Sequence, residues 1–171
     1  MNTLLSAFAE GLLSPILVPA HALTLCGLGL FIGQQTNRAL AVSSFAAGLA
    51  GGLTAIALAV GPTPSRIVLL ADAALIGGLV ASAWAPPKPV GWLLAVIAGT
   101  ALALDSPPQA ATIAQGNATL LGTALGACAL LLVVSAGATL ATRRWQQLAV
   151  RIVGSWIAAS AILVLAVMLA R

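Results

Sequence analysis

Apolar side chains occur in long continuous runs along this chain, separated by short turns that carry glycine, proline and single charges. Six runs are read as separate helices, with the ranges 18–33, 39–60, 65–84, 90–104, 118–141 and 148–169. The runs do not alternate between apolar and polar residues, as the strands of a membrane barrel do. A helix satisfies its backbone amides within one segment, as lipid requires. The pattern therefore predicts an all-α, polytopic transmembrane helical bundle of about six spans.

Composition excludes a soluble protein. The chain has 171 residues, of which 61% are hydrophobic and 6% are charged, whereas soluble domains carry about 25% charged residues. The length accommodates several spans but no additional globular domain. We therefore expect residues 1–171 to form a single transmembrane domain whose main partner is the lipid bilayer.

The basic residues predict a topology. Seven Lys and Arg residues are spread along the chain, mostly singly, so no clustered surface for nucleic acid is expected. Basic residues are enriched in short cytoplasmic loops. Six crossings place Arg66 and Arg171 on one face and the other five on the opposite face, whereas a re-entrant run 90–104 would give an uninformative split of four against three. We therefore expect a bacterial inner-membrane protein with both termini on the non-cytoplasmic side. The five basic residues on the predicted cytoplasmic face are Arg38, Lys88, Arg143, Arg144 and Arg151.

The first residues do not predict a cleavable signal peptide. They lack a positively charged segment before the first apolar run, and no small-residue cleavage site follows that run. We therefore expect residues before position 18 to form a short amphipathic lead-in, and insertion to depend on the spans.

Pairs of glycines four positions apart predict close helix contacts. Such pairs allow two helix backbones to approach each other in lipid, although a chain rich in alanine and glycine also produces this spacing by chance. The pairs are Gly29 with Gly33, Gly48 with Gly52, and Gly122 with Gly126.

The single histidine lies near the start of the first predicted span. Helical periodicity places His21, Thr24 and Gln35 on one side of that span, where they would form a polar lining of the bundle interior. The alternative is an interfacial histidine that is hydrogen-bonded to a carbonyl group or to water.

Asp72 is the strongest functional indication among the acidic residues. A carboxylate two turns into a span costs about 3 kcal/mol if it faces lipid. We therefore expect Asp72 inside the protein, near His21 or polar side chains of the fifth span. Glu10 and Asp105 are expected to be solvated charges at one membrane face.

No motif indicates an enzyme. The chain has three acidic residues, one histidine and two cysteines, and it contains no nucleophile elbow, phosphate loop or zinc signature. Cys26 and Cys128 fall inside apolar runs without ligand spacing, as structural thiols usually do. A catalytic function is therefore not expected.

The segment before His21 resembles a motif of the HupE/UreJ family of hydrogenase and urease accessory membrane proteins. That motif has the form HPxxGxDH, and the corresponding sequence here is SPILVPAH, in which Pro15 and His21 match. The preceding FAEGL and the following LTLCGLGLFIGQQ are also similar to the family, as are the six short spans and the late basic loop TRRW. The chain departs from the motif at Ser14, Val18 and Ala20, which replace histidine, glycine and aspartate.

The resemblance implies a small permease for divalent nickel or cobalt, with His21 and Asp72 near the transport pathway or metal. Two of the three presumed ligands of the motif are absent, and one imidazole does not select a transition metal. No cofactor is therefore assigned with certainty, and nickel or cobalt is expected as a transported ion. The alternative is a non-transporting accessory or structural subunit that has lost the metal ligands and associates with other membrane subunits or with copies of itself.

Overall fold

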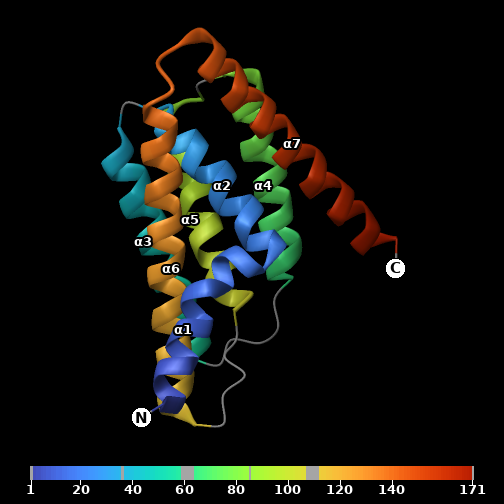
Figure 1. Ribbon diagram of the computed structural model, residues 1–171. Coiled ribbons are helices and arrows are strands. Elements are labelled where there is room, and N and C mark those ends of the chain that lie inside the picture. Colours follow the sequence, from blue (N-terminus) through green and yellow to red (C-terminus); the bar gives the residue numbers. More distant parts are fainter. Residues whose placement is uncertain (1, 36, 59–63, 85, 107–111, 171) are drawn as a thin grey trace.

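The chain forms a bundle of helices. The computed structural model describes residues 2–35, 37–58, 64–84, 86–106 and 112–170, and helices are the regular secondary structure found there (Figure 1). The prediction of an all-α fold is therefore confirmed. Positions 59–60 of the predicted second span and Arg171 lie outside the described residues. The helices are α1 (Asn2–Leu17), α2 (Pro19–Gly33), α3 (Arg38–Ala57), α4 (Ser65–Ser82), α5 (Lys88–Leu104), α6 (Ile113–Thr139) and α7 (Arg144–Leu169).

Local sequence explains several helix ends. Pro19 occupies the first turn of α2, where a missing N–H breaks no helical hydrogen bond. The Oγ1 atom of Thr112 accepts a hydrogen bond of 3.3 Å from the backbone N–H of Gln115 and so caps α6. Helix α4 ends at Ser82, and the next residue, Ala83, has a left-handed backbone conformation with φ 53°.

Four helices are long and apolar enough to cross a membrane, namely α3, α4, α6 and α7. Helices α1 and α2 pass this criterion together but are bent by 68° at the break between them, so up to five spans are supported. Helix α5 has 17 residues, about 25 Å of helix, which is shorter than a bilayer core of about 30 Å. The prediction of about six spans is therefore not confirmed by helix length and composition.

The segment before position 18 differs from the predicted short lead-in. It forms α1, a helix of 16 residues that lies along the first half of α6. A Cβ atom added at Gly122 or Gly126 would collide with backbone atoms of Phe8 or Leu12. The glycines of α6 thus provide the space that α1 occupies. The segment predicted as a short lead-in is therefore a helix that packs against α6.

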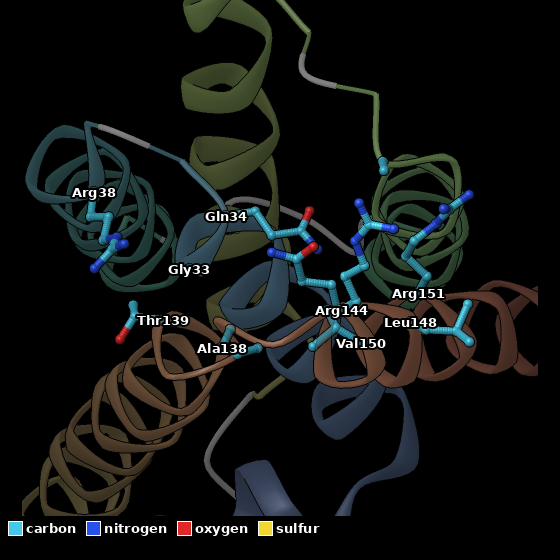
Figure 2. A pocket seen from close by; sticks show the side chains of 12 residues that line it. Gly33, Gln34, Arg38, Ala138, Thr139, Arg144, Leu148, Val150 and Arg151 are labelled. Atoms are coloured by element: carbon cyan, nitrogen blue, oxygen red, sulfur yellow. The ribbon is translucent and has the colours of Figure 1, made fainter.

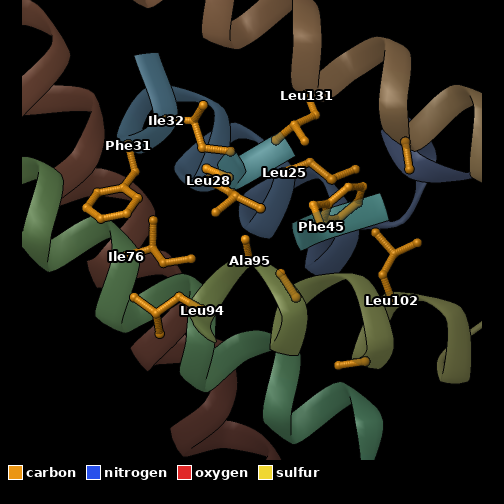
Figure 3. Close-up of a cluster of buried hydrophobic side chains, with 14 of the residues drawn as sticks. Leu25, Leu28, Phe31, Ile32, Phe45, Ile76, Leu94, Ala95, Leu102 and Leu131 are labelled. Atoms are coloured by element: carbon orange, nitrogen blue, oxygen red, sulfur yellow. The ribbon is translucent and has the colours of Figure 1, made fainter. Parts of the chain in front are cut away.

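Helix α2 lies at the centre of the bundle and contacts all six other helices. Its buried side chains Leu25, Leu28 and Ile32 pack with Phe45 of α3 and Leu131 of α6 (Figure 3). Because α2 is enclosed on several sides, a polar residue on it meets protein rather than lipid. This position determines the surroundings of His21.

All six glycines of the predicted pairs lie at helix contacts. A Cβ atom at Gly29 would lie 2.8 Å from Val134 of α6, and one at Gly52 would lie 2.6 Å from Ala103 of α5. The sequence did not single out Gly77 of α4, whose added Cβ atom would lie 2.8 Å from the carbonyl oxygen of Gly154 in α7. The remaining predicted positions, Gly33, Gly48, Gly122 and Gly126, also lack space for a Cβ atom.

Large apolar side chains cover much of the outer surface. Val133 of α6 and Trp156 and Leu163 of α7 are about two-thirds or more exposed. A soluble monomer rarely exposes so much contiguous apolar surface. The outer surface is therefore compatible with a membrane protein.

Candidate functional site

Three helix ends meet at the carboxylate of Asp105. The residue follows the last turn of α5, and its Oδ2 atom lies 3.1 Å from the Nε2 atom of His21, in the first turn of α2. The Ser65 hydroxyl, in the first turn of α4, donates a hydrogen bond of 3.3 Å to Oδ1. The Nε atom of Arg66 lies 3.5 Å from Oδ2.

This cluster is largely shielded from solvent. The side chains of His21 and Asp105 are 2% and 10% exposed, whereas that of Arg66 is 55% exposed. Helices α2 and α4 begin at the cluster, and the positive ends of their dipoles favour a negative charge there. Burial alone raises the pKa of Asp105, but the hydrogen bond from His21 and the charge of Arg66 outweigh it, so this pKa lies below its ordinary value.

The position of Asp105 corrects the expectation that it is a solvated charge. Its carboxylate is the partner of His21, whereas the sequence analysis expected His21 to lie near Asp72 or to be hydrogen-bonded to a carbonyl group or to water. No periodicity links the two residues because they are 84 positions apart on different helices. The available signal was the scarcity of charges, since a chain with so few acidic residues offers few partners for a buried histidine.

His21 has two distinct ring nitrogens. Nε2 faces Asp105, whereas Nδ1 is buried and has no hydrogen-bond partner among the described residues. An imidazole held by a carboxylate at one nitrogen is oriented to exchange a proton or to bind a cation at the other. The cluster therefore has the chemistry of a cation-binding site.

The predicted polar lining of α2 is not continuous. Thr24 is fully buried, and its hydroxyl proton is shared between the carbonyl oxygens of Ala20, at 2.8 Å, and of Leu69 in α4, at 3.1 Å. Gln35 follows the other end of α2 and lies against Gly91 of α5. Thr24 thus joins two helices, and Gln35 is a helix length away from His21.

Asp72 is buried in α4, as the cost of exposing it to lipid predicted. The residue is 3% exposed, and neither carboxylate oxygen has a hydrogen-bond partner within the described residues. The expected pairing with His21 or with polar groups of α6 is therefore not found. An unpaired carboxylate in such surroundings is costly, and intramembrane acidic residues commonly mark functional sites.

The residues present do not form a multidentate metal site. All His, Cys, Asp and Glu residues fall in the described part of the chain, and no group of three or more of them converges there. The motif segment is helical up to Leu17, with Pro15 inside α1, so the break is confined to Val18. Transition-metal selectivity needs several convergent donors, and His21 with Asp105 supplies two.

Comparisons with known proteins give no relative. No family model, no curated protein and no solved structure matches this chain.

Proposed function

We propose that the chain is an integral inner-membrane protein with six spans, in which the bent pair α1–α2 forms the first span and the short α5 forms the fourth. The ends of α2, α4 and α6 lie together at the upper end of the bundle (Figure 1). This arrangement supports a cytoplasmic position for this end of the bundle, where five of the seven basic residues lie in a loop or in the adjoining helix turns. Helix α5 packs between α3 and α4, so protein rather than lipid surrounds part of its length.

The proposed function is passage of a cation through a small HupE/UreJ-like permease. The observation that carries this proposal is the buried His21–Asp105 contact beside the break between α1 and α2. Transporters commonly place their ion sites at broken helices, where helix ends supply charge. The resemblance of the Ser14–His21 segment supports nickel or cobalt as the cation, with binding weakened by the missing ligands.

Arg66 competes with a cation for the Asp105 carboxylate. Its guanidinium already neutralises part of the Asp105 charge, so an incoming divalent cation competes with it. Because the Arg66 side chain is mostly exposed, it is free to move away without disturbing the core. A divalent cation that binds the Asp105 carboxylate would therefore displace Arg66 rather than add to it.

A flux measurement in reconstituted vesicles tests the proposal. Purified protein in liposomes should allow uptake of Ni²⁺ or Co²⁺, and His21→Ala and Asp105→Asn should each abolish most of it. Glu10→Gln is the matched control, because Glu10 is exposed on α1 and takes no part in the cluster. Uptake that is the same in all variants, or no greater than in empty vesicles, would contradict the proposal.

A non-transporting subunit is the second candidate. It is favoured by α7, in which only Gly154, Ile157 and Ala161 are buried, so that most of a 26-residue helix is uncovered. Purification in mild detergent, with identification of co-purifying chains and bound metals, separates the two functions. A stoichiometric membrane partner together with absent flux would support the subunit.

A further inference from the structure

An open cavity of about 660 Å³ lies where α2, α4 and α6 end and α3 and α7 begin. Arg38 of α3 lines one side, and Arg144 and Arg151 of α7 line another, with the Gln34 amide between them (Figure 2). Three guanidinium groups thus face one space that is remote from the His21 cluster, at the opposite end of α2.

The positive charge of this cavity has no carboxylate partner in the described residues. The Nε atom of Arg38 donates a bond of 3.1 Å to the Gln35 carbonyl. The Nε atom of Arg151 donates a bond of 2.8 Å to the Ala81 carbonyl. These bonds hold the side chains of Arg38 and Arg151 in place through their Nε atoms. The terminal guanidinium nitrogens remain available to an anion. The chain's three acidic residues all lie elsewhere: on α1, within α4 and at the end of α5.

A second groove leads away from the same arginine. Its volume is about 570 Å³, it lies between α3 and α6, and it shares Arg38 and Thr139 with the first cavity. Its walls include Val42 and Ala46 of α3 and Leu132 of α6. An anionic head at the arginines would therefore be continuous with an apolar tail in this groove.

We propose that the cavity binds the phosphate group of an anionic phospholipid, with one acyl chain in the α3–α6 groove. Guanidinium groups form paired hydrogen bonds with phosphate oxygens, and basic pockets between membrane helices suit lipid head groups. The apolar groove distinguishes a phospholipid from free phosphate, because free phosphate would leave it empty.

Lipid binding to delipidated protein in detergent tests the site. Dioleoylphosphatidylglycerol should bind more tightly than dioleoylphosphatidylcholine when bound lipid is counted by native mass spectrometry. Arg144→Gln should weaken phosphatidylglycerol binding about five-fold, as expected for loss of one basic residue at a membrane surface. The neighbouring Arg143→Gln is the matched control, because Arg143 carries the same charge but does not line the cavity.

Two further measurements decide the source of the phosphate. Ala46→Trp, which fills the exposed groove without removing charge, should weaken phosphatidylglycerol binding, and inorganic phosphate should not compete with the lipid at equal concentration. Equal binding of both lipids, an equal effect of the Arg143 and Arg144 substitutions, or full competition by phosphate would overturn the proposal. None of these results depends on whether the protein transports a cation.

Discussion

The Nε2 atom of His21 and the Oδ2 atom of Asp105 lie 3.1 Å apart, at the start of α2 and just past the end of α5. Ser65 and Arg66, at the start of α4, complete the surroundings of the carboxylate. One acidic side chain thus connects three helices near the break between α1 and α2. This contact joins the fold to the proposed function, because a change in its charge would alter how the helix ends are held.

Asp105→Asn should destabilise the protein and reduce its sensitivity to acid. Hydrogen bonds to a charged group contribute about 1.5–3 kcal/mol, and the substitution removes the charge. Because the pKa of Asp105 is held below its ordinary value of 3.8, its contribution is present above that value and is lost as pH falls through the lower pKa of the folded protein.

Thermal unfolding in detergent between pH 6 and pH 2 measures this effect. The wild-type midpoint should fall in the acidic part of the range, and the Asn variant should start lower and fall less. Glu10→Gln serves as the control. Parallel curves for wild type and Asp105→Asn would show that the carboxylate is not stabilised in its ionised form.

Thr24→Val should cost about 0.6 kcal/mol or somewhat more, as expected for a hydrogen bond between membrane helices. The substitution keeps the shape but removes the bond of 3.1 Å to the Leu69 carbonyl. The matched variant Thr54→Val should be nearly neutral, because the exposed Thr54 bonds only to the Gly51 carbonyl of its own helix. Equal unfolding midpoints for the two variants would contradict the role of Thr24 in joining α2 to α4.

Gly48→Ala should destabilise the protein, whereas Gly51→Ala should not. A Cβ atom at Gly48 would collide with the backbone of Val96 in α5, whereas no atom lies within 4 Å of one at Gly51. The first change should cost about 1–3 kcal/mol through overpacking, and the second should be neutral or stabilising by up to about 1 kcal/mol. The free energies of unfolding of the two purified variants test this prediction. A Gly48→Ala variant as stable as the wild type would show that α3 and α5 are not in close contact.

Asp72→Val should stabilise the protein by about 1–3 kcal/mol, because it removes buried oxygens that have no hydrogen-bond partner within the described residues. Asp72→Asn, which has a similar shape and remains polar, should be close to the wild type. Both variants are compared by unfolding and by cation flux. If both lose stability, the carboxyl group has a partner in the folded protein, and the unpaired description of Asp72 is wrong.

Cysteine labelling tests the proposed topology. Cys26 and Cys128 are first replaced by alanine, and single cysteines are then introduced at the exposed positions Thr142 and Ala170. These positions flank α7, so an impermeant reagent should label them from opposite sides of the membrane. Labelling of both from the same side would exclude α7 as a crossing helix.

The sequence alone determined the helical class and the general location of several features. Continuous apolar runs can satisfy their backbone groups in lipid only as helices, and the high cost of exposing a carboxylate placed Asp72 inside the protein. Gly48 and Gly122 were recognised as contact positions because their spacing repeats along one face of a helix. All of these inferences concern the periodicity or the solvation of a single segment.

Tertiary structure alone decided which segments meet. Helix α1 is a full helix because it fits against Gly122 and Gly126, and Asp105 reaches His21 because α5 ends where α2 and α4 begin. Helical periodicity fixes the side on which a residue lies, but not the height at which a neighbouring helix passes it. That height depends on the packing of small and large residues across the whole bundle. For this reason the sequence predicted a solvated Asp105, whereas the folded chain places Asp105 beside the only histidine.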